Sequence, residues 1–164
     1  MNSIQSSTNI IFQQMEQEDL DMVMAIEREA FPDPWHVSFF KRELRSRKKH
    51  THCYVARIDE KIVGYIVFYI FCGEGHIMNI AVDADYRRRG IAKYLLSSAL
   101  EIVHKEAGGE VFLEVGTNNT PAKQLYRQFG FKVYGIRKRY YRNGEDAFIM
   151  RKDVEYETTQ RSTN

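Results

Sequence analysis

Residues 79–93 read NIAVDADYRRRGIAK, and this stretch decides the fold. Residues 79–82 are typical of a buried strand, whereas apolar side chains recur at helical spacing after Gly90. Three consecutive arginines lie between the two patterns. The stretch therefore predicts a strand that runs through a basic loop into a long helix at residues 91–106, which Gly108 and Gly109 end.

The loop has the chemistry of a phosphate-binding site. Small residues at Gly90 and Ala92 allow backbone N–H groups to approach a pyrophosphate, and the helix N-terminus adds about half a positive charge. We expect a packed loop with no room for a side chain at Gly90. A solvated basic turn that caps an ordinary helix has the same spacing and stays open as an alternative. Standard nucleoside-triphosphate and dinucleotide motifs are missing from the sequence, which leaves an acyl carrier as the ligand.

The flanking segments predict an α+β order. Strands are expected at residues 10–14, 51–58, 62–72, 76–82, 111–115, 131–141 and 147–151, and helices at residues 20–31, 38–47, 91–106 and 121–129. Two prolines make residues 31–35 an elbow between the first two helices, and Asn143-Gly144 predicts a tight turn between the last two strands. We expect one three-layer α/β/α domain at residues 10–153, with a mixed, mostly antiparallel sheet.

The composition is that of a globular protein. The 164-residue chain is 43% hydrophobic and 28% charged, and its net charge of +2 disfavours a dedicated nucleic-acid binder. Residues 1–9 and 154–164 are polar and predict flexible ends. No apolar run is long enough to span a membrane, and neither the two cysteines nor the five histidines have metal-ligand spacing. We expect a cytoplasmic protein without a metal.

Glu114 and Tyr126 are candidates for acid–base chemistry. Alternation in residues 111–115 places Glu114 on one strand face among apolar neighbours, where partial burial would raise its pKa toward neutrality and make it a general base. The Tyr126 hydroxyl could donate a proton or a hydrogen bond to a thiolate leaving group. A solvated carboxylate and an aromatic core residue are the alternatives. Cys53 and Cys72 lack a neighbouring histidine, which disfavours a cysteine nucleophile.

The basic loop resembles the cofactor loop of the GNAT superfamily, whose pattern [QR]-x-x-G-x-[GA] lies between a strand and a long helix. Residues 87–92 match that pattern at every fixed position. The resemblance covers roughly residues 10–152 and is closest to the bacterial ribosomal-protein-alanine N-acetyltransferases. Other matching segments are Asn79-Ile80-Ala81-Val82, Leu113-Glu114-Val115, Asn119, Ala122, Leu125-Tyr126, Phe129-Gly130-Phe131 and Arg139-Tyr140-Tyr141.

The resemblance implies acetyl-coenzyme A as cosubstrate and direct transfer of its acetyl group to an amine, with Glu114 as base and Tyr126 as acid. The implied cofactor-binding residues are Ile80, Ala81 and Val82 for the pantetheine and acetyl carbonyl, Arg88, Arg89, Gly90, Ile91, Ala92 and Lys93 for the pyrophosphate, and Asn119 for another part of the cofactor. Ala92 and Gly116 depart from the closest relatives, in which glycine and a basic residue are common. The departure at Gly116 leaves the substrate preference open.

Two aromatic segments could form the walls of a peptide slot, as in related N-terminal acetyltransferases. They are Phe31, Pro32 and Trp35 in the elbow, and Tyr140 and Tyr141 near the last hairpin. Core packing is an equal alternative. The basic residues 137–139 with Arg142 also resemble an RNA-contacting patch, but we interpret them as a substrate-docking rim, and residues 42–49 as a solvated face.

These observations predict an enzyme of the acyltransferase class that acetylates a protein N-terminus, in particular the N-terminal alanine of a ribosomal protein. A GNAT enzyme that acts on a small amine or a lysine side chain would use the same loop and stays open. A non-catalytic module that binds RNA or a protein is a third alternative, which the presence of both Glu114 and Tyr126 disfavours. An accessory protein is compatible with each alternative, and we expect neither a membrane nor a nucleic-acid partner.

Overall fold

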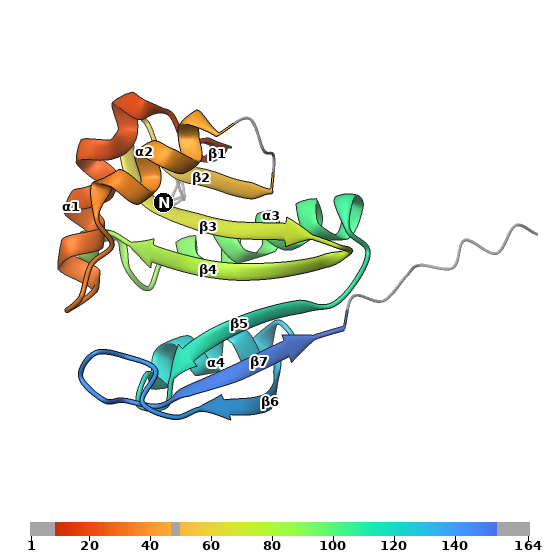
Figure 1. Ribbon diagram of the computed structural model, residues 1–164. Helices are drawn as coiled ribbons and strands as arrows, with labels where there is room; N and C mark the ends of the chain where they lie inside the picture. Colours follow the sequence, from red (N-terminus) through yellow and green to blue (C-terminus); the bar gives the residue numbers. More distant parts are fainter. Residues whose placement is uncertain (1–8, 47–49, 154–164) are drawn as a thin grey trace, which may run out of the picture. The chain divides into compact units, whose positions relative to one another are not determined.

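The computed structural model describes residues 9–46 and 50–153, and its helices and strands follow the predicted order (Figure 1). The strands are β1 (Ile10–Gln14), β2 (Thr51–Ile58), β3 (Lys61–Phe71), β4 (Glu74–Val82), β5 (Val111–Gly116), β6 (Lys132–Arg137) and β7 (Ala147–Lys152). The helices are α1 (Leu20–Ala30), α2 (Val37–Arg45), α3 (Ile91–Glu106) and α4 (Thr120–Gln128), with single turns of 3-10 helix at η1 (Gln17–Asp19) and η2 (Ala84–Tyr86). The flexible ends that we predicted lie, apart from residue 9, outside the described residues, as do residues 47–49 of the basic run.

The strands form a mixed sheet of seven in the order β1-β2-β3-β4-β5-β7-β6, which confirms the predicted α+β class. Four of the strand pairs are antiparallel: β1 with β2, β2 with β3, β5 with β7, and β6 with β7. By its contacts the chain divides into two compact units. The first contains the described residues up to Tyr69 together with Ile77–Glu101, and the second contains Ile70–His76 and the described residues from Ile102 onward. The single domain expected at residues 10–153 stays a prediction.

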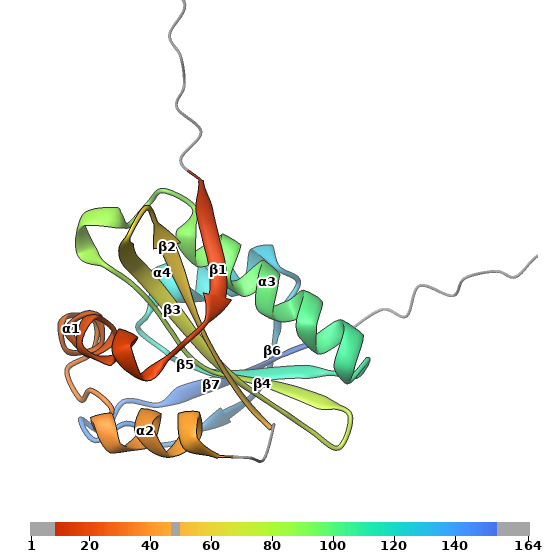
Figure 2. The same ribbon diagram turned by 90° about the horizontal axis from the view of Figure 1, so that it is seen from above.

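In the first unit, helices cover both faces of the strands (Figure 2). Helices α1 and α2 bury apolar side chains against β2 and β3, with Val23, Phe40 and Tyr65 fully covered. Helix α3 approaches the other face closely, because a Cβ atom at Gly64 of β3 would lie 3.1 Å from a Leu95 methyl carbon and 3.4 Å from an Ile91 methyl carbon. Burial of each large apolar side chain contributes about 1.5–3 kcal/mol to stability.

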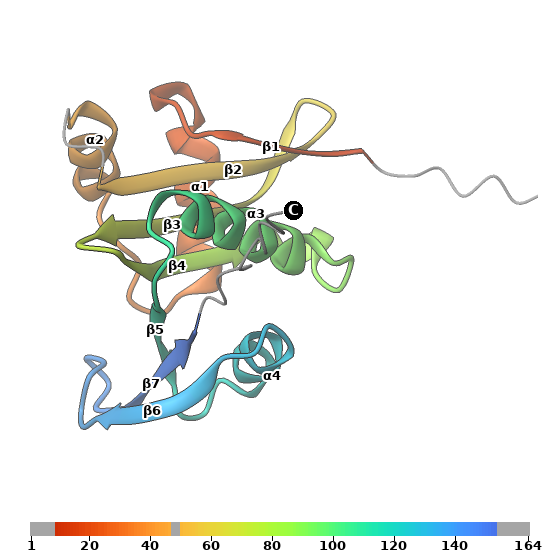
Figure 3. The ribbon, with the colours of Figure 1, turned by 90° about the vertical axis from the view of Figure 1, so that its right-hand side faces the viewer.

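In the second unit, α4 covers one face of β5, β7 and β6 (Figure 3). Tyr126 on α4 and Phe131, just after it, are buried with their ring centroids 5.9 Å apart. Strand β5 alternates between buried and half-buried residues, as the sequence predicted. Among the described residues of both units, no helix has the length and apolar character that a membrane span requires.

The last hairpin differs from its prediction. Strand β6 ends at Arg137, which pairs with Ala147, so residues 138–146 form a loop where the strand was expected to run to residue 141. The turn predicted at Asn143-Gly144 lies inside this loop, and the Gly144 N–H group donates to the Tyr141 carbonyl oxygen at 2.9 Å. The Asp146 carboxylate accepts hydrogen bonds from the Arg139 N–H group (2.8 Å) and the Lys138 ammonium group (2.9 Å). The Arg139 N–H group is thus bonded to a side chain and does not pair with a neighbouring strand, so the strand ends before the two tyrosines despite their β-propensity.

Candidate active site

The N-terminus of α3 presents backbone donors without a capping side chain. The Tyr94 N–H group donates to the Gly90 carbonyl oxygen at 3.0 Å, which makes Gly90 the N-cap residue. Glycine has no side chain with which to cap the helix, and helix geometry leaves the N–H groups of residues 91–93 without an acceptor inside the helix. The first turn contains no acidic residue. This helix end therefore attracts an anion.

The surroundings of Gly90 differ from those that we predicted. A Cβ atom at this position would meet no heavy atom within 4 Å, so the loop is open there and the expected tight packing is wrong. The backbone of Gly90 is left-handed, with φ of +80°, a conformation that glycine adopts without steric cost. The open space lies beside the backbone donors of α3. It is the space that a phosphate group would need in order to reach them.

The three loop arginines have different surroundings. Arg87, at the first position of the sequence motif, donates to the Val82 carbonyl oxygen at 3.2 Å and pairs with Glu29 of α1 at 2.6 Å. The Arg89 guanidinium lies over the Tyr86 ring, 4.9 Å from its centroid. Arg88 is exposed and has a left-handed backbone. Arg87 therefore braces the loop, whereas Arg88 and Arg89 add positive charge at the surface beside the open helix end.

The residues present fit the pyrophosphate of coenzyme A, because backbone donors, open space and cations occur together in this loop. Strand β4 leads directly into it, with Ala81 buried and Ile80 and Val82 half-buried. The individual contacts assigned to Ile80–Val82 and to Arg88–Lys93 stay predictions. Asn119 caps α4 instead of lying free, since its side-chain oxygen accepts from the Ala122 N–H group at 3.2 Å. Any bond from Asn119 to the cofactor would use its side-chain NH₂ group.

In the second unit, Glu114 is held between two basic side chains. The face predicted from alternation is confirmed, and the Glu114 side chain is 11% exposed. One carboxylate oxygen lies 2.7 Å from Nε2 of His76, and the other lies 3.3 Å from Nε of Arg137. His76 was missed as a site residue, because it lies 38 positions before Glu114 and only the packing of β4 beside β5 brings the two together.

The pKa of Glu114 is lowered from its ordinary value, so the predicted rise toward neutrality is wrong. The hydrogen bond from His76 is the main cause, and it outweighs the effect of burial. Arg137 lowers the pKa further. Glu114 is therefore ionised at neutral pH and can accept a hydrogen bond or attract an ammonium group without first losing a proton.

Tyr126 is buried, and its burial raises the pKa of the phenol well above the ordinary value of 10. The nearby Tyr141 adds to this rise. The hydroxyl group therefore stays protonated and is a donor at every pH in which an enzyme of this kind operates. The ring also packs against Phe131, so the functional and the core interpretation of Tyr126 are compatible.

Tyr140 and Tyr141 lie beside Glu114 and are partly exposed, at 46% and 37%. Their rings meet edge to face with centroids 5.1 Å apart, and the Arg137 guanidinium lies 5.7 Å from the Tyr140 centroid. Burial raises the pKa of Tyr141 to about 12, with smaller contributions from Tyr140, Glu145 and Glu114. These two phenols are hydrogen-bond donors at a surface, which core packing alone does not explain.

The elbow residues lie in the first unit, and two of the three named residues are only partly exposed to solvent. Phe31 and Trp35 are half-buried and pack against the core formed with α1 and α2, whereas Pro32 is exposed. Core packing is therefore part of the role of Phe31 and Trp35. The peptide slot that we predicted from the elbow and the two tyrosines stays a prediction.

The described residues give little support to a cysteine nucleophile or to a metal site. Burial raises the pKa of the Cys53 thiol to about 12, which disfavours the thiolate that a cysteine nucleophile needs. Within residues 9–46 and 50–153, no three histidine, cysteine, aspartate or glutamate side chains are grouped to hold a metal ion. The absence of a metal stays a prediction.

Known proteins resemble this chain in sequence and in structure. The sequence pattern of the acetyltransferase (GNAT) family matches residues 20–131. The chain is 41% identical over 126 residues to the N-alpha-acetyltransferase RimI of Mycobacterium tuberculosis, covering 74% of this chain and 77% of that protein. It is 30% identical over 139 residues to the ribosomal protein bS18-alanine N-acetyltransferase of Escherichia coli, covering 83% and 92% of the two chains.

The crystal structure of the ribosomal-protein-S18-alanine N-acetyltransferase from Escherichia coli superposes on this one with a TM-score of 0.82 and 27% sequence identity. The match covers 93% of this chain and 98% of that chain. The family match covers more than half of the sequence, and the loop at residues 87–92 lies inside it. The chain belongs to the GNAT family and is an N-acetyltransferase, of a family that uses acetyl-coenzyme A.

Proposed function

We propose that the protein transfers the acetyl group of acetyl-coenzyme A to the α-amino group of a protein N-terminus, in particular the N-terminal alanine of a ribosomal protein. The open, uncapped N-terminus of α3 at Gly90 is the observation that carries the cofactor part of this proposal. The acceptor is suggested by relatives named for N-alpha-acetylation and for the alanine of protein bS18.

Each part of the site has a role in this proposal. Bound acetyl-coenzyme A supplies an activated thioester carbonyl. The N–H groups and cations of residues 88–93 hold the pyrophosphate, and the backbone of residues 80–82 orients the acetyl end. Glu114 attracts the amine and accepts its proton, and His76 holds the carboxylate in place. Tyr126 remains protonated and donates to the departing sulfur.

The choice of an α-amine follows from its acidity. An α-amino group has a pKa of about 7.7–8.0, against about 10.4 for lysine, and this gap corresponds to roughly 3.4 kcal/mol for deprotonation. A carboxylate with a lowered pKa is a weak proton acceptor. Glu114 therefore suits an amine that is already partly neutral at pH 7 better than it suits a lysine.

We expect a peptide with a free N-terminal alanine or serine to be acetylated on its α-amine. Blocking that amine while an internal lysine stays free should remove acetyl transfer, because the lysine remains protonated and poorly reactive. Mass spectrometry of the two peptides, with a polyamine as a third acceptor, measures the difference. Undiminished transfer to the blocked peptide would support the lysine alternative, and transfer only to the polyamine would support the small-amine alternative. No transfer to any acceptor would support a binding module.

Replacing Tyr140 by alanine should raise the peptide KM while leaving the KM for acetyl-coenzyme A unchanged. The reason is that Tyr140 exposes a hydroxyl group beside Glu114, where it could hold the first peptide bonds. Steady-state kinetics at saturating acetyl-coenzyme A measures the change. Tyr134→Ala is the matched control, because Tyr134 is 62% exposed in the same unit and belongs to β6. Equal effects of the two substitutions would remove Tyr140 from the peptide site.

A further inference from the structure

Glu27 is a fully buried acid in the first unit. Its carboxylate accepts hydrogen bonds from three different parts of the fold. One oxygen accepts from the backbone N–H group of Trp35 at 2.7 Å. The other accepts from the Tyr65 hydroxyl group and from the side-chain amide of Asn79 at 3.0 Å. The amide of Asn79 also donates to the Tyr65 oxygen at 3.1 Å, which closes the network.

The Glu27 carboxylate has no cationic partner among the described residues, where its side-chain partners are the neutral donors of Trp35, Tyr65 and Asn79. A buried carboxylate without a cation is costly, and removal of one of its partners leaves a buried group unsatisfied. An apolar side chain on α1 would leave the Trp35 N–H group, the Tyr65 hydroxyl group and the Asn79 amide without this acceptor. The acid at this position therefore fixes these three groups relative to one another.

Through its partners, the Glu27 carboxylate connects the elbow to strand β4. Trp35 belongs to the irregular elbow after α1, where Pro32 and Pro34 provide no N–H donors. Asn79 lies on β4, directly before residues 80–82. One side chain thus links the elbow backbone to the strand that leads into the phosphate-binding loop. The Trp35 ring packs against Phe39 with centroids 4.4 Å apart, but that contact does not hold the elbow backbone to β4.

We propose that Glu27 is a positioning residue that holds the elbow in place relative to β4, so that the acceptor peptide and the acetyl end of the cofactor meet in a fixed geometry. The kinetic part of this proposal rests on the acetyl transfer proposed above. The structural part, the anchoring of the elbow by a buried acceptor, does not depend on it.

Trp35 reports on the elbow directly, because it is the only tryptophan of the sequence. Glu27→Met removes the acceptor at similar volume, so we expect a red-shifted Trp35 emission and stronger quenching by acrylamide. Glu27→Gln should behave like the parent, since its carbonyl oxygen can still accept from Trp35 while the Tyr65 hydroxyl and Asn79 amide reorient. Parental emission and quenching in folded Glu27→Met protein would overturn the proposal.

Kinetics separates positioning from a general loss of stability. Glu27→Met should raise the KM of the acceptor by about tenfold, the size expected for loss of one buried hydrogen bond, without changing the KM of acetyl-coenzyme A. A merely structural role would lower apparent kcat through inactive protein and leave both KM values unchanged. If Glu27→Met does not fold, Glu27→Asp decides the question, because its shorter side chain keeps the charge but retreats from Trp35.

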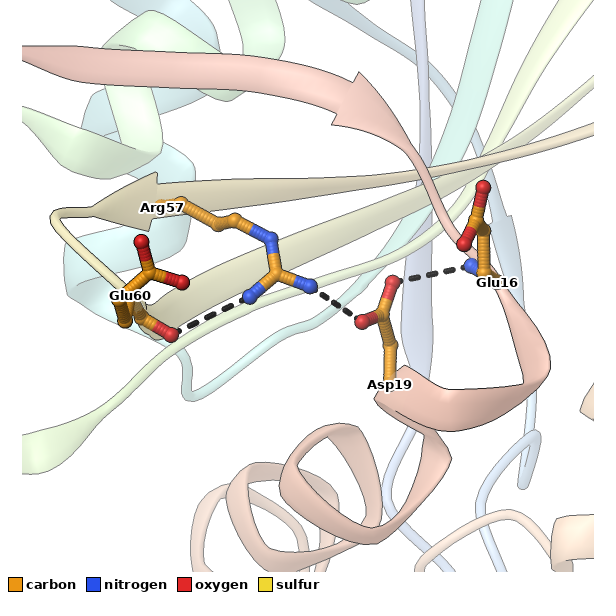
Figure 4. A network of polar contacts seen from close by, with 4 residues as sticks. All are labelled: Glu16, Asp19, Arg57 and Glu60. Carbon is orange, nitrogen blue, oxygen red and sulfur yellow. Dashed lines mark hydrogen bonds and ion pairs between the residues drawn. The ribbon is translucent and has the colours of Figure 1, made fainter.

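Asp19 provides a matched control in the same unit (Figure 4). It is also a buried acid, but it pairs with Arg57 and accepts from the Glu16 N–H group at 2.9 Å, away from the elbow. Asp19→Asn should lower the melting temperature without changing Trp35 quenching or the acceptor KM. Equal effects of Asp19→Asn and Glu27→Met would overturn the proposal.

The fluorescence and kinetic experiments also allow this inference to be tested separately from the proposed function. If the parent protein does not acetylate N-terminal peptides, the proposed function fails, and KM is measured with the amine that it does acetylate. The fluorescence arm needs no substrate. A response of Trp35 to Glu27→Met without any response to Asp19→Asn would then still support the anchoring role.

Discussion

Gly90→Val should abolish binding of acetyl-coenzyme A. Two effects act together at this position. The left-handed backbone, with φ of +80°, strains a β-branched residue by about 1–3 kcal/mol. The new side chain also fills the open space beside the donors of α3, where the phosphates must approach. Isothermal titration calorimetry with acetyl-coenzyme A measures the loss.

Gly73→Val is a control that distinguishes backbone strain from obstruction of the phosphate-binding space. Gly73 has a similar backbone, with φ of +82°, and a Cβ atom there also meets nothing within 4 Å. It lies in the turn between β3 and β4, outside the phosphate-binding loop. We expect Gly73→Val to bind the cofactor as the parent does. Parental binding by Gly90→Val would show that the loop is not the pyrophosphate site.

Glu114→Gln and Tyr126→Phe should each lower kcat by about 10²-fold or more, the range for positioned acid and base groups. Glu114→Gln removes the charge that attracts the amine and the partner of His76. Tyr126→Phe removes a buried hydroxyl donor and keeps the ring that packs against Phe131. Turnover at saturating peptide and acetyl-coenzyme A measures both effects, while cofactor affinity should barely change.

Controls for these two substitutions lie in the same unit. Glu110→Gln alters an acid that lies just before β5 and pairs with Arg151 at 3.1 Å, and Tyr134→Phe alters an exposed phenol. Both should retain parental turnover. If Glu114→Gln or Tyr126→Phe also retained it, the residue concerned would have no part in the reaction.

The pH profile provides a second measurement on Glu114. Because its pKa is lowered, the carboxylate is already ionised at mildly acidic pH, and its titration therefore causes no increase in activity near neutral pH. The activity of the parent should still increase between about pH 6 and pH 8, as the α-amine of the peptide loses its proton. Glu114→Gln should lower the whole profile and keep that increase. An increase that disappears in the variant would mean that Glu114 itself titrates near neutrality.

Most of the fold could be predicted from local patterns. Residues 91–106 were expected to be helical and form α3, because apolar spacing and the terminal glycines act over a few residues. The predicted end of the strand before the last turn, residue 141, was wrong for the opposite reason, since β6 ends at Arg137. The hydrogen bonds of Asp146 to Lys138 and Arg139 span seven or eight positions and compete with strand formation, and short-range propensity does not register them.

By itself, the sequence determined the family, the loop between a strand and a long helix, and the strand face that carries Glu114, since these depend on residue type and short spacing. Only the tertiary structure decided the chemical state of the site. His76 lowers the pKa of Glu114 across 38 positions, and Glu27 joins residues as many as 52 positions away. Charges and hydrogen bonds depend on distance in space, and in a folded chain that distance is set by packing rather than by separation along the sequence.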